Sequence, residues 1–96
     1  MEISKMLTIS IAHIKEQTLL MLASEPTSNR FPFIVVYPKS GYGYFLYIDR
    51  GAFEESQKHY EIPADLIAVI DFTIGADCNI LCLDCDGEEL QELETY

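Results

Sequence analysis

The chain has 96 residues, of which 49% are hydrophobic, and it carries a formal net charge of −10. We expect residues 1–96 to form one small domain, because this length supports a single hydrophobic core. A strongly negative surface repels phosphate backbones, so the composition argues against direct nucleic-acid binding and favours basic protein surfaces or cations.

The N-terminal stretch is apolar in patches, but charged and polar side chains such as Lys5, Lys15 and Glu16 interrupt it. No uncharged run approaches the roughly 18 residues that a membrane span needs. We therefore expect a cytoplasmic protein without membrane contact, in which the cysteines are free thiols. The charge is uneven, since residues 49–96 hold thirteen acidic and two basic side chains.

Residues 6–12 alternate between apolar and small or polar side chains, which predicts a strand. Helix formers without Gly or Pro then predict a helix over 15–24. The β-branched and aromatic runs 33–37 and 43–48 predict the two strands of a hairpin. Pro38 lacks an amide donor, so the first of these strands should end there or lie at a sheet edge.

Residues 49–61 form the one long polar connection, with room for a helical turn around Phe53. A better marked helix is predicted over 63–74, because Asp65 in its first turn suits the helix dipole. A last strand over 79–85 leads into an Asp-Gly turn and an acidic tail.

The predicted order is β-α-β-β-α-β, which is the ferredoxin-like plan. The expected fold class is therefore α+β, with a four-stranded antiparallel sheet and two helices on one of its faces.

Cys78, Cys82 and Cys85 have the C-x3-C-x2-C spacing by which radical enzymes hold an iron–sulfur cluster. In a strand over 79–85, however, Cys82 and Cys85 point to opposite faces, so they cannot grip one cluster or one zinc ion. We therefore expect structural cysteines and no cofactor.

The stretch from Asp84 to Gly87 also resembles the D-x-D-G opening of haloacid-dehalogenase-type phosphatases, but only nine residues follow it, where that signature opens a much longer domain. As a calcium loop it lacks an acidic position before the glycine and a distal glutamate, although Asp84, Asp86 and Glu88 could hold a divalent ion weakly. The simpler interpretation is that Asp84 ends the strand and Asp86-Gly87 makes a tight turn.

His13 lies between the first predicted strand and the first predicted helix. No Ser, Cys or acid is placed by the sequence to pair with it, so a capping or packed histidine is favoured over a catalytic one. Tyrosines crowd the hairpin, and strand alternation places Tyr44 and Tyr47 on opposite faces. Some of these rings should be exposed and suited to contact a partner.

Four stretches of the chain carry a family resemblance, and they are TISIAHIKEQT, VVYPKSGYGYFLYI, IPADL and the end of the chain from CLDCDG to LETY. Together they resemble domain-of-unknown-function family 5983, whose members occur on bacterial plasmids, prophages and other mobile elements. The family pattern has Thr, Trp and Pro where this chain has Ile11, Ile80 and Glu94, so the chain resembles a divergent member. The positions kept are Ala12-His13-Ile14, Tyr42-Gly43, Pro63, Asp65-Leu66, Leu83-Asp84, Asp86-Gly87 and Tyr96.

The resemblance implies no established activity, but a mobile-element setting favours stoichiometric binding to host proteins. We predict a non-enzymatic anti-defence inhibitor, such as an anti-CRISPR or anti-restriction protein, that presents carboxylates to a basic nucleic-acid-binding groove. One alternative is an immunity or antitoxin protein that neutralises a basic, nuclease-like toxin. Another is a small enzyme that uses His13 with Asp84 or Asp86.

The predicted contact surface is the acidic tail, joined by acids of the 49–61 connection and by two aromatic anchors. Carboxylates two apart on an extended strand are separated by about 7 Å, which suits successive basic side chains of a groove. The residues concerned are Asp84, Asp86, Glu88, Glu89, Glu92, Glu94, Glu54, Glu55, Tyr42 and Tyr44.

Overall fold

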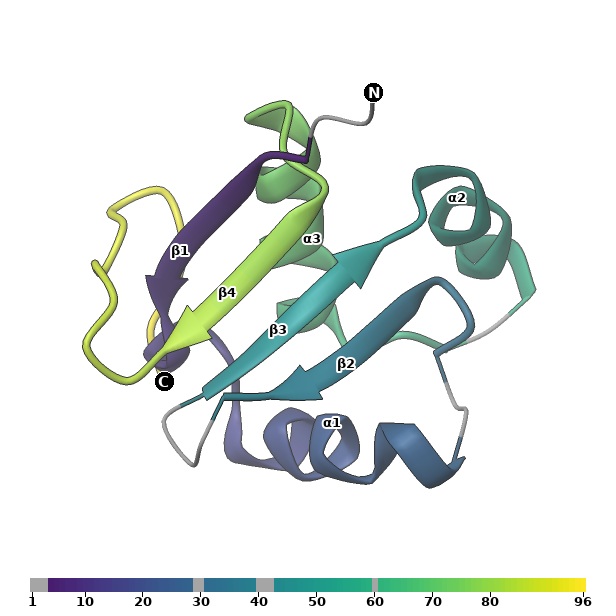
Figure 1. Cartoon of the computed structure of the whole chain (residues 1–96), viewed down its shortest axis with the longest axis horizontal. Coiled ribbons are helices and arrows are strands. Elements are labelled where there is room, and N and C mark those ends of the chain that lie inside the picture. The colour runs from purple at the N-terminus through teal and green to yellow at the C-terminus, as the bar shows by residue number, and fades with distance from the viewer. Residues whose placement is uncertain (1–3, 29–30, 40–42, 60) are drawn as a thin grey trace.

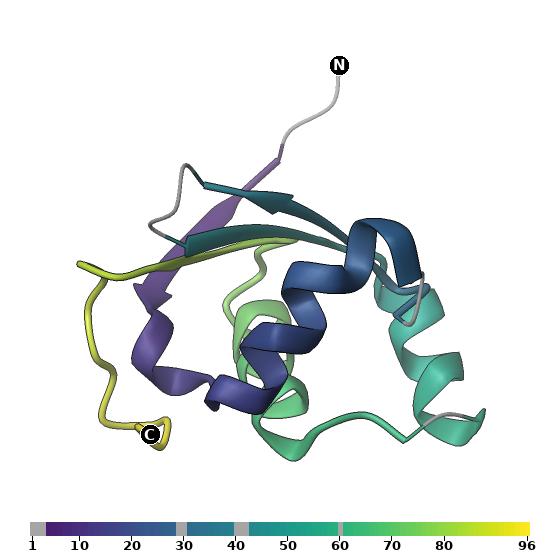
Figure 2. The same ribbon diagram turned by 90° about the horizontal axis from the view of Figure 1, so that it is seen from below.

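The computed structural model describes residues 4–28, 31–39, 43–59 and 61–96. One sheet forms the upper layer and the helices form the lower layer in the view of Figure 2. The elements in chain order are β1 (Met6–Ser10), the 3-10 helix η1 (Ile11–His13), α1 (Glu16–Ser28), β2 (Ile34–Pro38), β3 (Gly43–Ile48), α2 (Arg50–His59), α3 (Ala64–Gly75) and β4 (Ile80–Asp84).

The sheet has four strands in the order β1-β4-β3-β2, and it is mixed (Figure 1). β4 runs parallel to β1, with Thr8 opposite Cys82, and antiparallel to β3, with Phe45 opposite the same cysteine. The α+β class is confirmed. The purely antiparallel sheet and the two-helix count are wrong, because β1 pairs in parallel with β4 and three α-helices are present in the described residues.

The difference in topology comes from residues 49–61, which we expected to be a polar connection and which contain α2. A single helix after a strand returns the chain to the end of the sheet where that strand began, so the next strand is parallel to it. Two helices in succession return the chain to the end where the strand finished, so the next strand is antiparallel to it, as β4 is to β3. The N–H of Ile48 accordingly donates to the carbonyl of Asn79 at 2.9 Å, and β4 starts beside the end of β3.

α2 is a polar helix with a single large apolar anchor. Phe53 is 1% exposed, and its ring centroid lies 5.2 Å from that of Phe33. The carboxylate of Asp49 accepts the N–H of Ala52 at 3.1 Å, which supplies the N-terminal cap. A helix that buries one aromatic side chain has no apolar stripe along its length, so the hydrophobic pattern did not predict it.

The other elements lie close to the predicted ones, although β1 ends at Ser10, and residues 11 and 12, which were predicted to continue that strand, belong to the 3-10 helix η1. α3 begins and ends within one residue of the expected helix, and β2 ends at Pro38 on a sheet edge, as expected. α1 runs four residues beyond its predicted end at Ser24 and includes Pro26. None of the helices in the described ranges has the length and apolar character that a membrane crossing needs.

The core lies between the sheet and the helices. Leu81 and Leu83 of β4 are fully buried there, while Cys82 between them faces the uncovered side of the sheet. Burying one large apolar side chain contributes about 1.5–3 kcal/mol. Among the described residues, the fully buried apolar side chains of the core are Ile9, Leu22, Phe33, Leu46, Phe53, Leu66, Val69, Ile70, Leu81 and Leu83.

A buried carboxylate joins α3 to α1. Asp65 is 5% exposed, and its Oδ2 accepts the backbone N–H of Lys15 at 2.8 Å. Its Oδ1 accepts the hydroxyl of Thr18 at 3.0 Å. A negative charge at this position also complements the positive end of the α1 dipole. The residue predicted to favour its own helix therefore caps a different one.

We expect Asp65→Asn to lower the free energy of unfolding by about 1–3 kcal/mol, because the new amide group presents N–H where a donor already points. Urea unfolding measures the difference. Asp71→Asn, on the exposed side of the same helix, is the matched control and should change stability by less than about 0.5 kcal/mol. Equal effects of the two substitutions would contradict the cap.

Candidate functional site: the acidic tail

The tail is the segment 85–96, and it begins with the Asp-Gly turn that the sequence predicts. The N–H of Gly87 donates to the carbonyl of Asp84 at 3.0 Å, and the N–H of Asp86 donates to the Asp84 carboxylate at 2.8 Å. A Cβ on Gly87 would lie 2.4 Å from the carbonyl of Ile9, so only glycine allows this close approach. The N–H of Ser10 then donates to the carbonyl of Glu88 at 2.9 Å.

The side chain of His13 forms hydrogen bonds with the rest of the tail. The ring is 1% exposed, and its Nε2 accepts the N–H of Leu90 at 2.9 Å. Its Nδ1 lies 2.8 Å from the carbonyl of Glu94, to which it donates when the neutral ring carries its proton on Nδ1. The N–H of Tyr96 donates to the carbonyl of Ala12 at 2.8 Å. His13 is therefore a packed histidine that fastens a distant segment.

The same contacts decide which tail side chains face outward. Leu90 and Leu93 pack against the core and are partly buried. The hydroxyl of Tyr96 donates to the Glu94 carboxylate at 3.2 Å. All the acidic side chains of the tail are exposed, including that of Glu94, and we call these five acids the tail surface: Asp86, Glu88, Glu89, Glu92 and Glu94.

Asp84 differs from the other acids because it forms an ion pair with Lys39. The Asp84 side chain is 18% exposed. The hydrogen bond from Lys39, followed by that from the Asp86 N–H, lowers the pKa of the Asp84 carboxyl. The same bond raises the pKa of Lys39. Lys39 also lies 5.5 Å from the centre of the Phe45 ring, on the uncovered face of the sheet.

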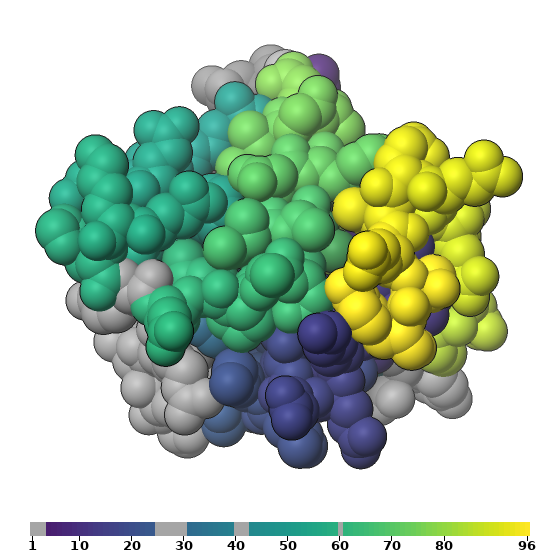
Figure 3. Space-filling view, turned by 180° about the vertical axis from the view of Figure 1, so that it is seen from behind, coloured from purple at the N-terminus to yellow at the C-terminus, as the bar shows by residue number. Residues whose placement is uncertain are grey.

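The other predicted contact residues do not join the tail surface. Glu54 and Glu55 are exposed on α2, at the end of the molecule opposite the tail (Figures 1 and 3). Glu55 already pairs with Lys58 at 3.6 Å. Tyr44 is partly buried on the helix-covered face, and Tyr42 lies outside the described residues.

The cations of the described ranges leave the tail surface unpaired. Lys5 and Arg50 both contact Asp77, at 3.2 and 3.4 Å, and lower its pKa, with Lys5 the larger cause. Lys15 lies over the Tyr96 ring, 5.2 Å from its centre. No salt bridge between described residues reaches any of the five tail-surface acids. Their negative charge is therefore available to a partner.

A groove beside the tail was not predicted from the sequence. Two adjoining hollows of about 620 and 290 Å³ lie between α3 and the tail, and they share Ala68, Glu92 and Leu93. Figure 3 shows the tail beside α3, with α2 on the other side of that helix. The available signal was the set of small and apolar residues on the outer side of α3, where Ala68, Phe72 and Gly75 accompany Asp71.

Two other surfaces lack the charge that distinguishes the tail. The uncovered face of the sheet exposes Met6, Val35, Tyr37 and Tyr47, with the two tyrosine rings 5.4 Å apart and edge to face.

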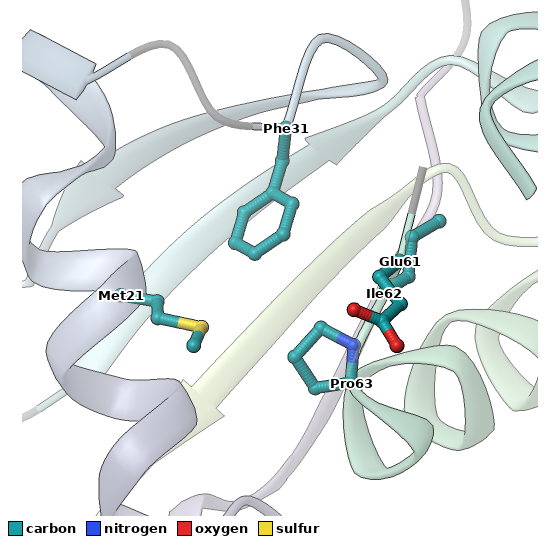
Figure 4. A pocket seen from close by; sticks show the side chains of 5 residues that line it. All are labelled: Met21, Phe31, Glu61, Ile62 and Pro63. Atoms are coloured by element: carbon teal, nitrogen blue, oxygen red, sulfur yellow. The ribbon is translucent and has the colours of Figure 1, made fainter. Parts of the chain in front are cut away.

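A separate hollow of about 300 Å³ lies near α1, where Phe31 points between Met21 and Pro63 (Figure 4). Among the described residues that line this hollow, Glu61 is the ionisable one, and none of them was predicted to form a site.

The three cysteines do not form a cluster. Cys82 is buried, whereas Cys85 is exposed and follows the end of β4 at Asp84, so it lies in the turn and not in the strand. Within the described ranges, the group of three potential metal ligands that lie within 4.8 Å of one another is Asp84, Cys85 and Asp86. Both carboxylate oxygens of Asp84 are already used by Lys39 and by the Asp86 N–H.

The geometry offers little support for catalysis by His13 with Asp84 or Asp86. Both ring nitrogens of His13 contact backbone groups of the tail, so neither is directed at a substrate. Asp84 is engaged by Lys39.

We expect His13→Ala to release the tail, because the Leu90 N–H and the Glu94 carbonyl both lose their partner. The free energy of unfolding should fall by about 1–3 kcal/mol. Amide hydrogen exchange should become faster at Leu90 and Tyr96 and stay slow at Leu81. His59→Ala, on the exposed end of α2, is the control. Unchanged exchange at Leu90 would contradict the role of His13.

We expect Lys39→Gln to raise the pKa of Asp84, which a carbon-detected NMR titration measures. Because the pKa of Asp84 is lowered in the folded protein, the pair stabilises the fold above the ordinary aspartate pKa. That contribution is lost as the pH falls through the lowered value, so the variant should show a weaker decline of stability in acid. Lys58→Gln should leave the Asp84 titration unchanged. Identical Asp84 titrations in parent and Lys39→Gln would disprove the pairing.

A family model described as the C-terminal domain of a family of unknown function, DUF5983, matches residues 6–96. The match covers every strand and helix of the structure. The comparisons with curated proteins and with solved structures found no match.

Proposed function

We propose that this chain, which belongs to the DUF5983 family of unknown function, is a non-enzymatic binding protein whose tail surface contacts a basic surface of another protein. The observation that carries the proposal is a set of five exposed carboxylates without a cationic partner among the described residues. The backbone beneath them is fastened at Ser10, Ala12 and His13. A surface that is ordered before binding loses less conformational entropy in the complex.

The electrostatics favour a particular kind of partner. Proteins that bind nucleic acids line their grooves with Lys and Arg, which neutralise the phosphates. Closely spaced carboxylates can bind the same Lys and Arg side chains in place of the phosphates. In its finer form, the proposal is an anti-defence inhibitor from a phage or mobile element that acts in the cytoplasm as a nucleic-acid mimic. An immunity protein against a basic toxin would use the same charges, so the identity of the partner separates the two roles.

The test compares two variants with the same change in charge. Glu88, Glu89 and Glu92 are replaced by Gln in the tail variant, and Glu54, Glu55 and Glu61 in the control variant. All six side chains are exposed. Glu94 is left in place because it accepts the Tyr96 hydroxyl. A partner captured with the parent protein is purified, and its affinity for each variant is measured at low and at moderate salt.

We expect the tail variant to bind about tenfold or more weakly than the parent, mainly through a slower association rate, and to show a smaller dependence on salt. The control variant should stay close to the parent. If the folded tail variant binds as tightly as the parent with the same salt dependence, the proposed function is wrong and the acids serve solubility.

A further inference from the structure

We infer that the groove between α3 and the tail is a binding site for an arginine- or lysine-bearing apolar segment of the partner. The inference rests on the proposed function and deepens it, because it names what part of a basic partner is bound. The site combines an apolar floor with an acidic rim, and the two features select the same type of side chain.

The floor is apolar and continuous. Ala68 and Leu93 line both hollows and join them into one groove. Phe72 extends the floor in the larger hollow, where Gly75 and Ala76 add no side-chain bulk. Small residues on α3 let an incoming segment approach its backbone closely, and the larger hollow of about 620 Å³ lies within the size range of ligand sites.

The rim is acidic on both sides. Asp71 lies on α3, and Glu92 and Glu94 lie on the tail. Asp71 and Glu92 are exposed, and neither forms an ion pair with another described residue. Asp65, in the wall of the smaller hollow, already accepts hydrogen bonds from Lys15 and Thr18 at the start of α1. Lys15, which lies over the Tyr96 ring, is a cation near this end of the groove.

Arginine and lysine match this arrangement because each has an aliphatic stem and a charged head. The stem can lie along Ala68 and Leu93 while the head reaches the carboxylates of the rim. A hydrogen bond between such a head and a carboxylate is stronger than one between neutral groups. A neutral apolar segment would leave the rim unpaired, and an acidic segment would be repelled.

The test uses two fluorescein-labelled amphipathic peptides of equal length, one of leucine and arginine and one of leucine and glutamine. Binding is measured by fluorescence anisotropy, and the contact surface is mapped by amide chemical-shift changes in NMR. We expect the arginine peptide to bind more tightly than the glutamine peptide and to shift Ala68, Phe72 and Leu93.

Two substitutions then address the groove without touching the tail surface. Ala68→Leu fills the junction of the two hollows, and Asp71→Asn removes the rim charge that α3 supplies. Each should weaken binding of the arginine peptide, Ala68→Leu by about tenfold because added bulk in a shaped site displaces the ligand. Ala23→Leu, at an exposed position of α1, is the matched control.

The outcomes separate this inference from the proposed function. If Ala68→Leu and Asp71→Asn both bind the peptide and the captured partner as tightly as the parent, while the tail variant does not, the groove inference is wrong and the proposed function stands. Shifts confined to Met6, Tyr37 and Tyr47 would place the peptide on the uncovered sheet face and also overturn the inference. Full binding by the tail variant overturns the proposed function itself.

Discussion

The buried imidazole of His13 is the contact on which the outer surface of this protein depends. One ring offers an acceptor at Nε2 and a donor at Nδ1, and the tail supplies the matching N–H of Leu90 and carbonyl of Glu94. Leu90 and Leu93 pack against the core beside these two bonds, and the acidic side chains of the tail point outward. Together with the backbone bonds at Ser10 and Ala12, this contact keeps the carboxylates of the tail on an attached segment and places that segment beside α3, where the groove forms.

The ion pairs of the described residues involve acids outside the tail surface. Lys5, before β1, and Arg50, at the start of α2, form ion pairs with Asp77. Lys39 forms an ion pair with Asp84. The protein thus neutralises acids at the ends of its sheet and leaves those of the tail exposed. A buried polar group must be paired within the fold, whereas an exposed carboxylate remains hydrated until a partner replaces the water.

Residue type alone was a poor guide to role at several positions. Asp65 was expected to favour its own helix and instead caps α1. Tyr44 was a candidate anchor but lies on the helix-covered face. In each case the side chain is directed by an element far away in the sequence.

What the sequence determined by itself is local. Alternation of side chains located the strands, the first-turn Asp65 marked α3, Pro38 marked the end of an edge strand, and Asp86-Gly87 marked a turn. The family and the density of acids near the end of the chain could also be recognised there. All of these signals arise between near neighbours, where backbone preferences and side-chain periodicity act directly.

Only the tertiary structure decided the parallel pairing of β1 with β4, the course of the tail and the groove beside α3. The pairing depends on α2, which is held by Phe53 and lacks an apolar stripe. The tail depends on His13, which contacts Glu94 across 81 positions of the chain. Such contacts form because a donor, an acceptor or an apolar ring needs a partner once water is excluded, and the partner is chosen by packing between elements that are not adjacent in sequence.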